Sequence, residues 1–235
     1  MNNFKLIFLF SIVIFGTSCS EKQPLTEVPE QGKIEYEIHY SNSLRDNSVF
    51  GFALPKKLCG VYNEYGVKMS SQCGLGIIKG DVVCSTNESF MTMRVDETKF
   101  ILPLSEFVES IVNLQNTDSA ANVVFYDENY KISGWDSKKV NISYKTALLE
   151  DSVNIEMFYV PVPFEREFEF ISGDSKIKKL PGLIVAMNVS SGDKNVMIIM
   201  KDLEATEVSK DEFSRPNGYR TSTVQQVDSM VMSFF

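Results

Sequence analysis

The chain has 235 residues, of which 23 are basic and 31 are acidic, and its formal net charge is −8 at pH 7. This acidic balance argues against nucleic-acid binding and against electrostatic attraction to anionic membrane surfaces. The single histidine, His39, provides almost nothing for imidazole metal sites or for Ser-His and Cys-His catalysis, and no spacing singles out a pair of carboxylates. We therefore predict no metal, no cofactor and no catalytic residue, and we expect a protein that is not an enzyme.

Residues 1–18 have the three parts of a secretory signal peptide. Lys5 lies near the start, an apolar run covers residues 6–15, and small residues occupy positions 16–18. The apolar run is shorter than the ~18 residues that a transmembrane helix needs. We therefore expect this segment to be removed.

Cys19 follows the small residues, and Thr17 to Cys19 resemble the lipobox of bacterial lipoproteins, although Gly16 stands where that pattern prefers an aliphatic residue. The resemblance implies that cleavage leaves Cys19 as an N-terminus carrying acyl chains such as palmitate. Two or more chains give stable membrane anchoring, at ~0.8 kcal/mol for each buried methylene. Ser20, not Asp, follows the cysteine, and in this the chain resembles bacterial lipoproteins that are sorted to the outer membrane and not to the inner membrane. The protein would lie there on the periplasmic side or at the cell surface. The alternative is an ordinary signal peptide with a cysteine near its cleavage site.

Residues 19–32 are polar, contain two prolines and show no apolar periodicity, so we interpret them as a flexible tether. No linker-like stretch interrupts residues 33–235. A single domain is therefore expected there.

A first strand is predicted over residues 33–40, where Ile34 and Tyr36 begin an alternation of apolar and polar residues that also places His39 on a solvated side. The same period of two returns in residues 152–160 and 182–189. Such strands have one solvent-exposed face, so we expect an antiparallel sheet with a single buried side. Ser191, Gly192 and Asp193 follow the last of these runs and predict a hairpin. Shorter runs of the same style occupy residues 60–63, 66–71, 76–85, 89–95 and 98–102.

Two amphipathic helices are predicted, one starting at an N-cap on Ser105 and one in residues 221–235. Both carry an apolar stripe with which they can lie across the apolar face of the sheet.

Three cysteines remain in the domain after Cys19 is assigned to the anchor: Cys59, Cys73 and Cys84. An odd number in an exported protein leaves one free thiol or one intermolecular bond. Cys73 pairs with Cys84 across a hairpin, or with Cys59 on a preceding strand, and the sequence leaves both disulfides open.

Five stretches follow one another along the chain: "GKIEYEIHY" (32–40), "LPKKLCGVYNEYGVKMSSQCGLG" (54–76), "YKISGW" (130–135), "KLPGLIVAM" (179–187) and "FSRPNGY" (213–219). As an ordered set they resemble the LolA-like periplasmic lipoproteins, which include an uncharacterised lipoprotein family. The family often has a cysteine where this chain has Asp136, so a disulfide there is not carried over.

The resemblance implies a mainly β fold with minor α content: an incomplete antiparallel β-barrel with one or two helices covering its concave apolar face. In relatives, the cavity between the concave face and the helices receives acyl chains of lipoproteins or other lipids. An open half-barrel leaves a cleft that an apolar ligand can occupy.

We therefore expect a lipid-anchored envelope protein that binds or locally transfers a lipid or acyl chain without catalysis. Methionine suits the lining of such a cleft because its chain is unbranched and polarizable, although packing in an ordinary core is the alternative for each residue. The predicted lining residues are Met91, Met93, Met157, Tyr159, Val185 and Met187.

A second hypothesis is an envelope scaffold that binds a protein partner and fills the cleft with its own helix. Function would then lie on irregular segments, for which residues 113–123 and 159–174 are the longest candidates. The second segment combines two prolines with three phenylalanines, and it either exposes an aromatic patch or covers one end of the sheet.

Overall fold

The computed structural model describes residues 27–46, 54–73, 76–106, 122–144, 152–166 and 180–227. A short helix, α2 (Asn42–Asp46), and a 3-10 helix, η5 (Lys210–Phe213), accompany the strands. The strands are β1 (Gly32–Tyr40), β2 (Lys57–Asn63), β3 (Gly66–Cys73), β4 (Ile78–Ser85), β5 (Ser89–Val95), β6 (Thr98–Pro103), β7 (Asn122–Ile132), β8 (Trp135–Tyr144), β9 (Val153–Arg166), β10 (Leu180–Ser191), β11 (Lys194–Ala205) and β12 (Arg220–Thr221).

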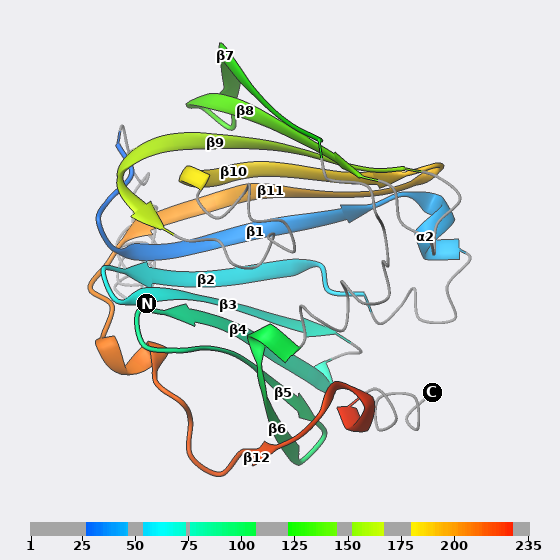
Figure 1. The fold of residues 1–235 in the computed structure, drawn as a ribbon, viewed down its shortest axis with the longest axis vertical. Helices are drawn as coiled ribbons and strands as arrows, with labels where there is room; N and C mark the ends of the chain where they lie inside the picture. The colour runs from blue at the N-terminus through cyan, green and yellow to red at the C-terminus, as the bar shows by residue number, and fades with distance from the viewer. Residues whose placement is uncertain are drawn as a thin grey trace, which may run out of the picture.

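These strands form one 12-stranded sheet in the order β12-β6-β5-β4-β3-β2-β1-β11-β10-β9-β8-β7 (Figure 1). The order has two ends, at β12 and β7, so the sheet stays open as an incomplete barrel. Neighbouring strands are antiparallel, with the short β12 as an exception that lies parallel to β6. The expected fold class, mainly β with one open antiparallel sheet, is confirmed.

The sheet consists of two meanders in which neighbours along the chain are neighbours in space. The N-terminal meander contains β1 to β6, and the C-terminal meander contains β7 to β11. Pairing of β1 with β11 joins them in the middle of the sheet, where Ile38 lies opposite Ile198. Figure 1 shows these two strands side by side.

β1 has the predicted alternation. Ile34 and Tyr36 are buried, whereas Glu35 and Glu37 on the other side keep contact with solvent. His39 is 45% exposed and lies 3.9 Å from Glu37, as expected for a solvated strand residue. We call the side of the sheet that carries Ile34 the apolar face and the side that carries Glu35 the polar face.

Two tight turns lie at positions where the sequence contains glycine. The predicted hairpin joins β10 to β11 through Gly192 and Asp193, with Gly192 at a φ of 57°. In "YKISGW", Ser133 and Gly134 both have positive φ, 51° and 86°, and Trp135 opens β8. Glycine adopts such backbone angles without the steric cost that a Cβ brings, which explains its place in both turns.

The expectation of a single buried side is wrong for the N-terminal meander. After β11 the chain crosses the polar face to reach β12, and we call this segment, residues 206–219, the strap (orange in Figure 1). Its side chains cover apolar residues that point to the polar face, so both faces are buried there. This second cluster comprises Val83, Phe90, Ile101, Val208 and Phe213.

The predicted helices lie only partly within the described residues. Residues 104–106 are helical directly after β6, and the rest of that helix lies outside the described ranges. Residues 224–227 are helical, and Val224 and Val227 pack against Phe100 on the apolar face. This contact agrees with a helix covering that face. None of the described helices is long and apolar enough to cross a membrane.

Two predicted boundaries are corrected. β9 continues to Arg166, so the first part of the expected irregular segment 159–174 is strand. Pro161 is tolerated there because a register shift lies beside its pair with Gly182. At the other boundary, Val28 of the expected tether packs on the core. Residues 19–26 of the expected tether, which include Cys19, and residues 167–174 lie outside the described residues.

Neither proposed disulfide is compatible with the strand register. Cys84 lies opposite Val67, six residues along β3 from Cys73, which corresponds to ~20 Å. Cys59 lies opposite Ser70, three residues or ~10 Å from Cys73. Disulfides need Cα atoms no more than ~6.8 Å apart. In the structure Cys59 and Cys73 are free thiols, and burial raises the pKa of Cys73.

Candidate functional site: an apolar face across six strands

Four of the six predicted lining residues lie together in the C-terminal meander. Met157 and Tyr159 come from β9, and Val185 and Met187 come from β10. Met157 and Tyr159 form a buried cluster with two β8 residues, and Met187 packs against it. Val185 belongs to the adjoining cluster at the centre of the sheet.

The other two predicted residues are separate from these four. Met91 and Met93 lie on β5, and Met93 packs with Phe100 near the other end of the sheet. Both occupy the apolar face, since Met91 lies opposite Val82 and Leu102. However, β4, β3, β2, β1 and β11 intervene between them and the first group. The structure therefore divides the predicted lining into two groups.

Strand register extends the first group into two rows of apolar residues across six neighbouring strands. Residues directly opposite each other in a sheet share a face, so each row presents its side chains together. One row is Ile38, Ile198, Met187, Met157, Val140 and Phe125. The neighbouring row is Tyr40, Val196, Val189, Ile155, Ile142 and Val123.

Access to these rows differs from one strand to the next. Met157 and Val140 are completely buried, and Tyr159 is 6% exposed. Met187 is half-buried, and Phe125 on the edge strand β7 is 49% exposed. Phe125 on β7 is thus the most accessible side chain of the two rows. Sequence reasoning missed Phe125 because β7 has no clear alternation and only the register assigns its residues to the rows.

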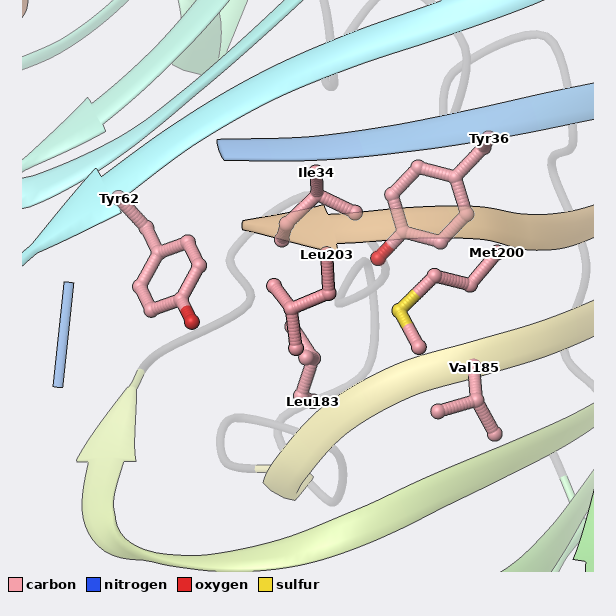
Figure 2. Packing of buried hydrophobic residues seen from close by; sticks show 7 residues of the cluster. All are labelled: Ile34, Tyr36, Tyr62, Leu183, Val185, Met200 and Leu203. Carbon is pink, nitrogen blue, oxygen red and sulfur yellow. The ribbon is translucent and has the colours of Figure 1, made fainter. Parts of the chain in front are cut away.

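A polar group is placed within the apolar face by a β-bulge. The β9 to β10 register shifts between Ile184 and Ala186, and the Tyr36 hydroxyl donates a hydrogen bond of 2.8 Å to the carbonyl of Ile184. Burial, with a smaller effect from Tyr62, raises the pKa of Tyr36 far above its usual value. The hydroxyl therefore stays neutral, and the face carries no charge at this point. Figure 2 shows Tyr36 among the side chains of the buried cluster at the centre of the sheet.

The polar face of the C-terminal meander carries a paired charge under aromatic rings. The Lys139 ammonium contacts the Glu156 carboxylate and lies 5.2 to 5.8 Å from the ring centroids of Tyr126, Phe158 and Tyr130. The hydrogen bond that Lys139 donates to the Glu156 carboxylate raises the pKa of Lys139. This cluster is filled by its own lysine, so we do not assign a ligand to it.

A groove on the polar face between β11, β1, β2 and β3 has a volume of about 380 Å³. Charged residues dominate its lining, and it includes Lys68, which pairs with Glu212 of the strap at 3.0 Å. Such a lining does not suit an apolar ligand. Across the described ranges, no group of three or more His, Cys, Asp or Glu side chains is arranged to hold a metal ion.

No protein-family model matches the chain, and no curated protein matches it significantly in sequence. Among solved structures, PNGF-II in the C2 space group aligns at a TM-score of 0.50 and 12% identity, over 86% of this chain and 32% of that chain. The Mycobacterium tuberculosis lipoprotein LppX aligns at 0.36 and 9%, over 77% and 90%. LprF from Mycobacterium bovis aligns at 0.32 and 9%, over 76% and 88%.

The chain thus spans about a third of the length of PNGF-II. The likeness to PNGF-II in the C2 space group, at 12% identity, supports a shared fold and nothing finer. The site must therefore be interpreted from its own residues.

Proposed function

We propose that the protein binds a hydrophobic ligand, a lipid or an acyl chain, on the apolar face of the C-terminal meander and performs no catalysis. The observation that carries this proposal is the pair of apolar rows in register across β1, β11, β10, β9, β8 and β7. Five strand spacings of ~4.8 Å make each row about 24 Å long. An elongated apolar molecule can lie along such a surface, where every CH₂ group removed from water contributes ~0.8 kcal/mol.

We further propose that acyl chains on Cys19 attach the protein to the outer membrane. A permanent anchor favours a tethered receptor or local transfer partner over a carrier that diffuses between membranes. The anchor would also explain how a chain with a net charge of −8 resides at a membrane that its charge does not seek.

A matched pair of methionines tests the ligand site. Met187 lies on the apolar face of β10, and Met197 lies on the polar face of β11 with 39% exposure. A lysine at Met187 would carry charge into the proposed contact, whereas a lysine at Met197 would face solvent. Membranes containing the full-length protein are treated with a photoactivatable fatty acid, and the crosslinked peptides are mapped by mass spectrometry.

We expect label on β7 to β10, about tenfold weaker in Met187→Lys and unchanged in Met197→Lys, which corresponds to ~1.4 kcal/mol of binding free energy. Absence of label from these strands, or equal labelling of both variants, would argue against the proposal.

Burial of Met157 and Val185, both 0% exposed, favours a second candidate, an envelope scaffold whose apolar face is already packed. This candidate predicts no photolabel on β9 or β10. It also predicts that chemical crosslinking in intact envelopes recovers one defined protein partner from the full-length chain.

A further inference from the structure

Three cations lie directly opposite one another on adjacent strands of the polar face. Lys79 on β4 pairs with Arg94 on β5, and Arg94 pairs with Lys99 on β6. Gln72 of β3 continues the row beside Lys79, and Tyr219 of the strap lies at its other end, with the Lys99 ammonium 5.7 Å from the ring centroid. We call Lys79, Arg94 and Lys99 the basic row.

The basic row has no carboxylate partner within the described ranges. The ion pairs found there involve other lysines and arginines, such as Lys68 with Glu212. The carboxylate nearest along the same face of β4 is that of Asp81, and its Oδ2 accepts a hydrogen bond of 3.0 Å from the Thr92 hydroxyl. The row is therefore a local cluster of basic side chains on a chain that has a surplus of acidic residues overall.

Arg94, at the centre of the row, has a polar atom without a partner. Its Nε is buried and makes no hydrogen bond. A buried donor without an acceptor is costly, and like charges directly opposite each other destabilise a sheet. An anion that lies between the flanking ammonium groups removes the repulsion between these facing cations. Lys79 and Lys99 are exposed, so an anion can approach from solvent.

We propose that the basic row binds a phosphate group. A planar guanidinium with several donors matches the oxygens of a phosphate, and two flexible ammonium groups add charge on either side. The phosphate belongs either to a phospholipid headgroup or to a free phosphate ester or ion. The row lies on the face opposite the proposed apolar site, so neither proposal depends on the other.

The test measures thermal unfolding of the mature full-length protein in detergent. Inorganic phosphate is compared with sodium chloride at equal ionic strength, and soluble dihexanoylphosphatidylglycerol is compared with dihexanoylphosphatidylcholine. Binding to the folded state raises the unfolding temperature as the ligand exceeds its dissociation constant. We expect a rise with phosphate, with the anionic lipid or with both, and the arm that responds identifies the source of the phosphate.

Arg94→Gln should abolish the rise in unfolding temperature, and Lys99→Gln should reduce it. Lys194→Gln, at the exposed start of β11, should retain it. Without ligand, Arg94→Gln should unfold at the same temperature as the wild type or higher, because a like charge is removed. If Arg94→Gln does not fold, calorimetric titration of the exposed-site variant Lys99→Gln gives the same comparison. No rise with either phosphate source, or equal rises in the wild type and the basic-row variants, would overturn the proposal.

Discussion

Tyr36 connects two strands that are not neighbours. Its side chain extends from β1 past β11 to β10, where its hydroxyl reaches the carbonyl of Ile184 at the β-bulge. Without this donor, a half-buried carbonyl at an irregular position of the ladder would lose this hydrogen bond. One phenol group therefore helps to hold the junction of the two meanders.

Removing that hydroxyl should destabilise the protein. For Tyr36→Phe we expect a loss of about 1–2 kcal/mol in the free energy of unfolding, measured with urea near neutral pH, because the Ile184 carbonyl loses the donor that the buried Tyr36 side chain supplies. Tyr40→Phe is the matched control. Its hydroxyl donates to Pro55 at 2.8 Å from a partly exposed position, where water can replace it, so a smaller loss is expected. Equal losses would contradict this interpretation of Tyr36.

The contribution of Tyr36 should also appear in how the free energy of unfolding depends on alkaline pH. Burial raises the folded-state pKa of Tyr36 above its unfolded value of about 10, so the folded state holds this proton more tightly. Its contribution to stability is complete below pH ~10 and declines as pH rises above that value. Unfolding free energies at pH ~9 and ~11 should therefore differ less in Tyr36→Phe than in the wild type. Residual pH dependence is expected from Tyr40 and Tyr159, whose pKa values are also raised by burial.

Among the larger elements, the strap determines how the polar face of the N-terminal meander is covered. Asn63 donates a hydrogen bond of 2.8 Å to the carbonyl of Val208, and Lys68 pairs with Glu212. Phe213, 4% exposed, is the apolar anchor of the segment. The strap then delivers the chain to β12, beside β6.

Phe213→Ala should cost about 3–5 kcal/mol of unfolding free energy, the usual range for a buried aromatic ring, as measured by urea unfolding. Ser209→Ala is a control in the same segment. The Ser209 side chain caps η5 by accepting a hydrogen bond from the Asp211 amide, and its loss should cost about 0.5–1 kcal/mol. A cost below ~1 kcal/mol for Phe213→Ala would mean that the strap does not hold the second cluster together.

Elements whose pattern is local were predictable from the sequence. The alternation of β1 and the β10 to β11 hairpin depend on residues close together in the chain, and both are confirmed. Strand order depends on distant segments, so the separation of Met91 from Met157 was not predictable. The cysteine pairings were wrong for a related reason: proximity in sequence does not give the register that places Cys73 and Cys84 far apart.

For the molecule as a whole, the N-terminal segment leaves the domain at a defined place. Val28 packs on the central cluster, the Tyr62 hydroxyl donates to the carbonyl of Pro29 at 3.0 Å, and the Val208 amide donates to Gln31 at 3.1 Å. If Cys19 is acylated, the few residues between it and Val28 span at most about 30 Å. The end of the sheet where β1 begins, at the left in Figure 1, should then lie nearest the membrane.

Fluorescent labels at opposite ends of the sheet test this orientation. Glu64 lies in the turn after β2, at the β1 start, and Asp193 lies in the turn after β10, at the other end. In a Cys59→Ser background, labels on Glu64→Cys and Asp193→Cys are compared in vesicles containing spin-labelled headgroups. Stronger quenching is expected for the Glu64 label. Equal quenching, or stronger quenching at Asp193, would contradict the proposed anchor geometry.

The pairing of β1 with β11 also has a kinetic consequence. Each meander contains hairpins between neighbouring segments, which form quickly, whereas β1 and β11 come from opposite ends of the domain. Contacts between such distant segments form slowly because a long loop must close first. While the chain folds, one edge of β1 therefore stays unpaired until β11 arrives, and during that interval the half-formed sheet presents an open edge to aggregation or to a chaperone.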